Sequence, residues 1–346
     1  MYLLEEALEL WSAVLTQTPS PASADVLSLL PNLFPIFQAA TDSAPLALQI
    51  AESYILLAPQ EVLSDRIRLP FLCSLEALLS SASRNRIGIV PHLVEMLIRA
   101  TETIDGGSAG SYEVVAKSLL DSSFLQVILE GLHSAHEASQ ATGPNRKTSH
   151  VYGILETDYF SVLARLALAN PRIFLSVIAA ATSSSDEQTL SWLLTEWFFH
   201  YDNIGLASQK KLHVLALTQL LALNNNDDPN SPPPPAYLLG HLQSYLTVWT
   251  DIITELADES ANTDNLIFWN KPTIENDDGG EEPPESIRRR DWENSDAVHK
   301  INIREFIAEK FRRVINACGG EARFQEDVLV NVDREVLNAF GELHIL

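Results

Sequence analysis

The chain of 346 residues carries 46 acidic and 23 basic side chains, a formal net charge of −23 at neutral pH. Nucleic-acid binding requires lysine and arginine to neutralise phosphate, so this charge argues against it and suits basic protein partners instead. Apolar residues make up 46% of the chain and only 14 residues are glycine, which together with abundant leucine and alanine predicts a folded, all-helical protein. Charge or proline interrupts every apolar run of membrane-spanning length, so no membrane insertion is expected.

In chain order, an amphipathic helix is predicted at 2–16 and a proline-bent helix at 24–40. The next unit, Ser43–Ala82, reads as two antiparallel helices that separate near Pro59 and are apolar on more than one side. Pro59 suits the first turn of the second helix, whereas Pro70 should kink or split that helix. A pair with two apolar sides must be sandwiched between similar pairs, as in a helical-repeat solenoid.

Further helix pairs are predicted to begin near residues 84, 154, 186 and 236. Together with the starts near 2 and 43, the spacing is roughly 40 residues, the period of HEAT or armadillo repeats. The sequence therefore predicts an all-α protein in which residues 1–258 form an α-solenoid of about six to seven HEAT-like helical hairpins. We expect these hairpins to form a right-handed superhelical array.

After residue 258 the composition changes. Residues 259–296 are predicted to be an acidic, partly disordered linker, because acids dominate its first part and ENDDGGEEPPE at 275–285 contains no apolar run. RRR at 288–290 resembles a basic localisation signal, but we favour a structural interpretation in which it pairs with the linker or with a neighbouring acidic helix. Residues 297–346 are expected to form a C-terminal helical pair, about 303–318 and 324–343, that packs on the last repeats.

The motifs that could carry chemistry lack the context that chemistry needs. GGSAG at 106–110 fits a hydrolase nucleophile pattern around Ser108, but a predicted helix precedes it where a strand is required. His133 and His136 are spaced like metal ligands, yet no matched pair occurs on another helix. Cys73 and Cys318 are expected to be small core residues of an intracellular protein. We therefore expect no enzyme, no catalytic residue, no metal and no cofactor; a helical hydrolase that uses Ser108 is kept as an alternative.

The C-terminal part resembles a known family. DNLIFW at 264–269, PPESIRRRDWENSDAVHKINIREFI at 283–307 and CGGEARFQEDVLVNVDREVLNAF at 318–340 are similar to the tail of importin-eleven-like receptors of the importin-β (karyopherin-β) superfamily. MYLLEEALELWSAVL at the start and LQIAESYILLAP at 48–59 resemble earlier helices of the same receptors. The resemblance spans nearly the whole chain and implies that the chain is the C-terminal portion of such a receptor, with the family pattern continuing upstream of Met1.

The resemblance implies the C-terminal cargo-binding arch of a nuclear import receptor that shuttles between cytoplasm and nucleus through the nuclear pore. Basic cargo proteins would meet acidic side chains, and the candidate partner-binding residues are Asp277, Asp278, Glu281 and Glu282. Grooves between outer helices would receive phenylalanine side chains of nucleoporin phenylalanine–glycine repeats. Ran-GTP releases cargo from the intact family, although the repeats that make its main contacts have no counterpart here. The alternative is a HEAT-repeat scaffold or regulatory subunit without a transport role.

Overall fold

The structure is a computed structural model that describes residues 2–39, 42–81, 88–103, 109–141, 148–223, 232–260 and 282–345. All regular secondary structure in these ranges is helical and none of it is a strand, so the predicted all-α class is confirmed. Among the described helices, none combines the length and the apolar character that crossing a bilayer would need. The chain divides into two compact units, unit 1 (residues 1–130 and 270–296) and unit 2 (residues 131–269 and 297–346).

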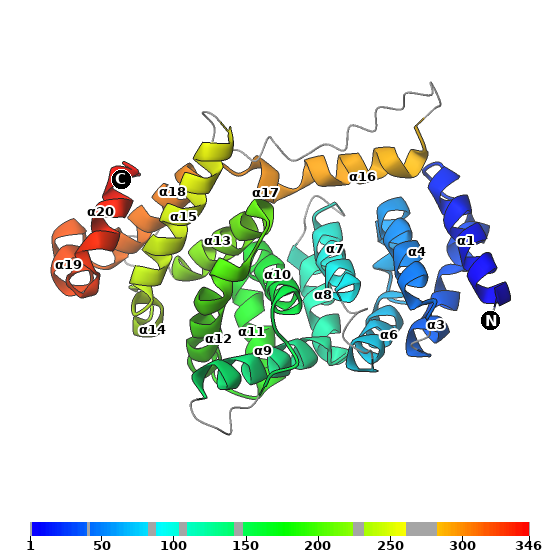
Figure 1. Cartoon of the computed structure of the whole chain (residues 1–346), viewed down its shortest axis with the longest axis horizontal. Helices are drawn as coiled ribbons and strands as arrows, with labels where there is room; N and C mark the ends of the chain where they lie inside the picture. The colour runs from blue at the N-terminus through cyan, green and yellow to red at the C-terminus, as the bar shows by residue number, and fades with distance from the viewer. Residues whose placement is uncertain are drawn as a thin grey trace. The chain divides into compact units, whose positions relative to one another are not determined.

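Unit 1 contains helices from both the beginning and the later part of the chain (Figure 1). Its helices are α1 (Tyr2–Gln17), α2 (Ala24–Ser28), η1 (Leu30–Leu33), α3 (Phe34–Gln38), α4 (Ala44–Leu57), α5 (Pro59–Val62), α6 (Arg68–Ser81), α7 (Ile89–Thr103), α8 (Ala109–Asp121), the first turns of α9 (Phe124–Gln140) and α16 (Pro284–Ser295). Helices α1, α4 and α7 pack in one layer, and α3, α6 and α8 pack in a second layer beside it.

The unit predicted at Ser43–Ala82 corresponds to α4, α5 and α6. Because α4 lies between α1 and α7, ten of its 14 residues are buried, as the apolar pattern on more than one side predicted. Pro59 begins α5, in agreement with the prediction. The second helix is split between α5 and α6, and Pro70 lies in the first turn of α6, where its missing N–H breaks no helical hydrogen bond.

Cys73 corrects one prediction. Its side chain is exposed rather than buried in the core, and Cys318 is half-buried. Helix α6 buries Phe71, Leu72 and Leu75 along one stripe. Because the helix turns by about 100° per residue, position 73 lies on the opposite, solvent-facing side. The burial of a single position could not be read from the apolar content of the segment around it.

Three helices of unit 1 are joined by a short chain of hydrogen bonds. Trp11 Nε1–H donates to the hydroxyl of Tyr54 at 2.9 Å, and that hydroxyl donates to the carbonyl of Val26 at 2.7 Å. Burial raises the pKa of Tyr54 to about 12, with a smaller lowering effect from Trp11, so the hydroxyl keeps its proton at neutral pH. Tyr54 thereby connects α1, α2 and α4.

Replacing Tyr54 by phenylalanine is expected to lower the free energy of unfolding of unit 1 by about 1 kcal/mol, because one donor and one acceptor lose their partner. Urea denaturation of Tyr54→Phe, Trp11→Phe and the double variant measures the coupling. Since both single changes remove the same bond, the double variant should lose less unfolding free energy than the two single variants lose in sum. Strict additivity would show that the bond contributes nothing.

Unit 2 begins in α9 and has the same two-layer construction. Its remaining helices are α10 (Ile154–Ala169), α11 (Pro171–Thr182), α12 (Asp186–His200), η3 (Tyr201–Asn203), α13 (Ala207–Leu221), α14 (Ala236–Leu239), α15 (Leu242–Ser260), α17 (Ala297–Lys300), α18 (Ile303–Ala317), α19 (Glu321–Asp327), η4 (Leu329–Asn331) and α20 (Arg334–Glu342). Helices α10, α13 and α15 pack in sequence, α18 packs on α13 and α15, and α20 packs on α15.

The end of unit 2 departs from the predicted helical pair. Helix α18 ends at Ala317 and is followed after Cys318 by Gly319 and Gly320, whose φ angles of 94° and 91° favour glycine. The second predicted helix is divided into α19, η4 and α20. The segment between α19 and α20 is VLVNVD at 328–333. Its β-branched residues disfavour the helix, and its Asn and Asp side chains compete for backbone hydrogen bonds.

Candidate functional site

The structure describes one of the four candidate partner-binding residues. Both carboxylate oxygens of Glu282 accept hydrogen bonds at 2.8 Å from Arg290 of α16. Asp277, Asp278 and Glu281 lie outside the described residues. The acidic segment is thus partly neutralised at its end by a basic residue of its own chain.

Helix α16 lies within the stretch predicted to be an acidic linker. Pro284 at its first turn and Glu285 beside it are favourable helix starters. Glu285, Arg288, Arg289 and Trp292 follow at i, i+3, i+4 and i+7, which places them on one face of the helix. In unit 1 α16 crosses α1 and α4 and extends to α7 (Figure 1). This spacing was the sequence signal for a helix. The stretch was predicted to be a linker because of its acidic composition.

The end of α1 receives the first arginine of α16. Arg288 donates through Nη1 to the carbonyl of Thr18 at 2.7 Å and through Nη2 to the carbonyl of Leu15 at 3.2 Å. The last carbonyls of a helix have no partner within the helix and carry its partial negative charge. The guanidinium therefore supplies donors where α1 leaves acceptors unpaired.

Helix α4 receives the second arginine through an acidic pair. Arg289 forms an ion pair with Glu52 of α4 and donates to Glu285 of its own helix at 3.0 Å. The same Glu285 oxygen accepts from the hydroxyl of Ser53 at 3.0 Å. The cluster alternates acid, guanidinium and acid, so that each charge faces its opposite.

Helix α7 reaches the other end of α16 through Arg99. Its guanidinium lies 4.6 Å from the centre of the Trp292 ring and donates to the Trp292 carbonyl at 2.7 Å. It also lies 3.5 Å from the carboxylate of Asp296. Since all three arginines at 288–290 pair within the chain, the structural interpretation of this motif is confirmed. Sequence reasoning missed the residues that contact α16, which are Glu52 and Ser53 of α4 and Arg99 of α7. Nothing local in the sequence pairs α4 or α7 with a helix so distant in the chain.

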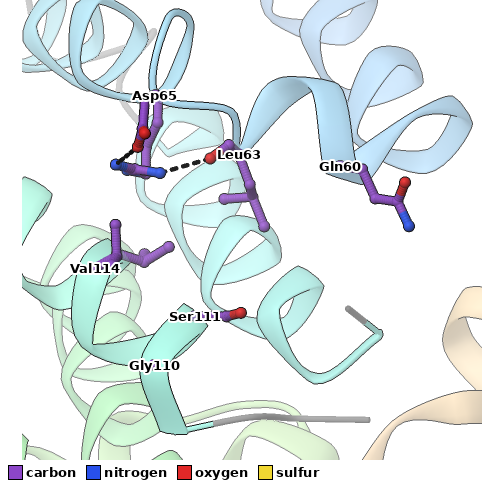
Figure 2. A pocket seen from close by; sticks show the side chains of 8 residues that line it. Gln60, Leu63, Asp65, Gly110, Ser111 and Val114 are labelled. Carbon is purple, nitrogen blue, oxygen red and sulfur yellow. Dashed lines mark hydrogen bonds and ion pairs between the residues drawn. The ribbon is translucent and has the colours of Figure 1, made fainter. Parts of the chain in front are cut away.

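A groove of about 500 Å³ opens in unit 1 between the turn that precedes α6 and the start of α8 (Figure 2). Leu63 and Val114 provide its apolar part, and Val114 is 41% exposed. Arg68 is occupied within the fold: it donates to the Leu63 carbonyl at 2.6 Å, to Asp65 at 2.7 Å and to the Ser118 hydroxyl at 2.9 Å. The groove therefore combines apolar and polar lining residues.

A second groove, of about 390 Å³, lies in unit 2 between α18 and α19. Its floor is apolar, and it is lined by Phe311, Arg312, Ile315, Asn316, Glu321, Phe324, Gln325 and Leu329. Phe311 and Phe324 pack edge to face at 5.6 Å and are buried, so they belong to the core of unit 2. The groove can admit an apolar group over this aromatic floor.

The histidine pair considered as metal ligands has other partners. His136 Nδ1 lies 3.0 Å from Glu196, which also accepts from the Ser139 hydroxyl at 3.0 Å, and His133 packs against Trp192. Burial raises the pKa of Glu196, against the lowering effect of the bonds from Ser139 and His136. In the described part of the chain no group of His, Cys, Asp and Glu could hold a metal ion. Ser108 lies outside the described residues.

The fully buried His213 has a fixed tautomer. Trp197 Nε1–H donates to His213 Nδ1 at 3.1 Å, so the imidazole proton resides on Nε2, which faces the Ser161 hydroxyl at 3.1 Å. Burial, with the nearby charges of His200 and Arg165, lowers the pKa of His213 to about 3. A fully buried, neutral imidazole between α10, α12 and α13 has a structural role.

Comparison with known proteins assigns the family. Residues 1–345 match the family described as "Importin-11-like, TPR repeats". The chain belongs to this family. It is 26% identical over 345 residues to "Importin beta-like protein kap113" of Schizosaccharomyces pombe, covering 98% of the chain and 30% of that protein. It is 24% identical over 354 residues to "Importin-11" of Homo sapiens, covering 99% of the chain and 32% of that protein.

A solved structure shows the same fold. The chain matches "Lph2, a novel bidirectional nuclear transport receptor in S. cerevisiae" with a TM-score of 0.70 and 18% identity, over 97% of this chain and 33% of that one. This likeness confirms the predicted HEAT-like helical-repeat fold, and the family match confirms the resemblance drawn from the tail. The chain spans about a third of the length of these relatives.

Proposed function

We propose that this chain is the C-terminal cargo-binding arch of a nuclear import receptor and that it binds basic cargo proteins. Family membership supports this role, because relatives in the family are named importins. In this proposal the intact receptor shuttles between cytoplasm and nucleus and contacts nucleoporin phenylalanine–glycine repeats through grooves between helices. It releases its cargo in the nucleus when Ran-GTP binds.

The observation that carries the proposal is the anchoring of α16 on unit 1. This helix ties Glu282, the last residue of the acidic run at 275–282, to a folded surface by the pair with Arg290. Acidic residues next to a fixed surface raise the rate and specificity of association with a basic partner. Asp277, Asp278 and Glu281 are the residues proposed to make that contact, since Glu282 already has a cation.

Reversing three charges, Asp277→Lys, Asp278→Lys and Glu281→Lys, is expected to weaken binding of a basic partner about tenfold at low salt. The loss should shrink above about 0.15 M salt, where exposed charges are screened. Fluorescence anisotropy with a labelled peptide rich in lysine and arginine measures the affinity. A pulldown with phenylalanine–glycine repeats tests the transport role separately from the scaffold alternative.

The matched control reverses three exposed acids of α1, with Glu5→Lys, Glu6→Lys and Glu9→Lys. Both triple variants change the net charge equally, so a difference between them reports position rather than total charge. The control should change the affinity less than twofold. Equal losses in both variants, or no loss in the first, would refute a direct role of the acidic segment.

A further inference from the structure

Two C-terminal helices of the chain are attached by different forces. Helix α18 packs in unit 2 with an apolar face and buries Ile303, Ile307, Ala308, Phe311 and Val314. Helix α16 packs in unit 1, and Glu285 is the only buried one among its 12 residues. Burial of apolar surface is the main favourable contribution to packing. Helix α16 has no fully buried apolar residue, so this contribution is smaller for α16 than for α18.

The inward face of α16 also leaves polar atoms unsatisfied. Glu285 Oε2, Arg288 Nε and Trp292 Nε1 are buried and have no hydrogen-bond partner among the described residues. A buried polar atom without a partner loses the water that it would bind when exposed, which opposes docking. Burial likewise lowers the pKa of Arg288, although Glu285 acts against it.

Charges supply most of the attachment. Arg288 binds the carbonyls at the end of α1, Arg289 pairs with Glu52, and Arg99 of α7 holds Trp292. The side chain of Arg289 is 42% exposed, and ion pairs that reach solvent contribute little and weaken with salt. We call α16 a strap, because it is held mainly by contacts that added charge or salt weakens.

The surface beneath this strap has a defined chemistry. It offers two helix-end carbonyls and Glu52 as acceptors for guanidinium groups, and Arg99 as a cation for an aromatic ring. A helix with two adjacent arginines and an aromatic residue three or four positions later matches all three features, as α16 itself does. We propose that the α1–α4–α7 face beneath α16 is a docking surface for an arginine-bearing helix of a partner protein, with α16 as its internal competitor.

This proposal rests on the proposed function for the basic character of the partner, and it adds where such a partner docks and what regulates it. A tethered competitor acts at the high effective concentration that its linkage to the chain sets. Only the fraction of molecules whose strap is released can bind, and the apparent affinity falls in proportion to that fraction. Weakening the strap should consequently strengthen binding of the partner.

The test uses the full chain and a labelled peptide of residues 283–296, PPESIRRRDWENSD. Arg288→Ala with Arg289→Ala is expected to raise the affinity for this peptide at least tenfold over the unmodified chain, because the surface is vacated. The matched control is Arg290→Ala, on the same helix, whose observed partner is Glu282 rather than α1, α4 or α7. It should stay within twofold of the unmodified chain.

Adding Glu52→Gln to the double variant should then reduce peptide binding, since the receiving carboxylate is lost. Equal peptide binding by the unmodified chain and the double variant, or an equal effect of Arg290→Ala, would overturn the proposal. Hydrogen–deuterium exchange of the unmodified chain provides a measurement that needs no variant: α16 should exchange faster than α18, and faster still as salt rises. Equal protection of the two helices at every salt concentration would also overturn it.

Neither readout depends on the acidic segment at 277–281. A failed charge-reversal experiment with a successful peptide experiment would reject the proposed role of the acidic segment and leave the docking surface standing. The reverse pattern would reject the docking surface and leave the acidic segment as the binding element.

Discussion

Replacing Trp249 by alanine is expected to lower the free energy of unfolding of unit 2 by about 4 kcal/mol, the range for deleting a large buried aromatic side chain. Trp249 of α15 is fully buried and donates from Nε1 to the Thr218 hydroxyl at 2.8 Å. Its ring lies 5.1 Å from that of Phe311 on α18 and 5.9 Å from that of Phe340 on α20. The substitution opens a cavity at the centre of the cluster through which the last helices pack on α15.

Hydrogen exchange in α15 and α18, together with a urea titration, measures this loss. Trp249→Phe keeps most of the apolar contact and loses only the hydrogen bond to Thr218. It should therefore lower the free energy of unfolding clearly less than Trp249→Ala does. Phe199→Ala removes an aromatic ring that is 67% exposed on α12 and should change stability by less than about 0.5 kcal/mol. Comparable losses for Phe199→Ala and Trp249→Ala would contradict the assignment of Trp249 to the core.

Acidification from pH 7.5 to pH 5 should remove about 2 kcal/mol of the stability of unit 2 through His213 alone. Its pKa is about 3 in the folded protein and 6.5 when unperturbed, so the unfolded chain binds more protons below pH 6.5. The contribution is therefore fully present above pH 6.5 and is lost as pH falls toward 3. Glu196, whose pKa burial raises, acts in the opposite direction because the folded state takes up a proton there.

His213→Gln isolates the effect of the imidazole, since glutamine can still accept from Trp197 and donate to Ser161 but does not titrate. The difference in unfolding free energy between pH 7.5 and pH 5 should shrink by about 2 kcal/mol in this variant. His344→Asn is the control, because His344 is exposed and its φ of 50° is tolerated by asparagine. An unchanged pH dependence in His213→Gln would show that His213 titrates normally.

Local patterns predicted the repeating units better than the contacts between them. The apolar positions of Ser43–Ala82 identified a helix pair buried on two sides, because side-chain period alone determines which faces are apolar. Helix α16 was predicted to be part of a linker, because its residues are charged and nothing nearby shows what they pair with. Its partners are distant in sequence: Ser53 and Glu285, which share a hydrogen bond, are 232 residues apart.

The candidate site was predictable in composition and not in geometry. The sequence showed an acidic run followed by three arginines, and it predicted that these arginines pair inside the chain. It could not show that the α1 carbonyls and Glu52 receive Arg288 and Arg289. Every residue has a backbone carbonyl, so a sequence does not show which carbonyls accept a bond from Arg288. Which of many acids pairs with Arg289 depends on tertiary packing.

The late position of α16 in the chain has a consequence for synthesis. The ribosome completes α4 more than 200 residues before it reaches Glu285, and Ser53 and Glu285 are separated by 232 residues. About 180 residues separate the end of α7 from α16, so at about 5–20 residues per second the face made by α1, α4 and α7 stays uncovered for roughly 10 to 40 seconds. During that interval the nascent chain presents Glu52 and the end of α1 to solvent, so a chaperone or an early-binding partner can reach this face before the chain's own helix does.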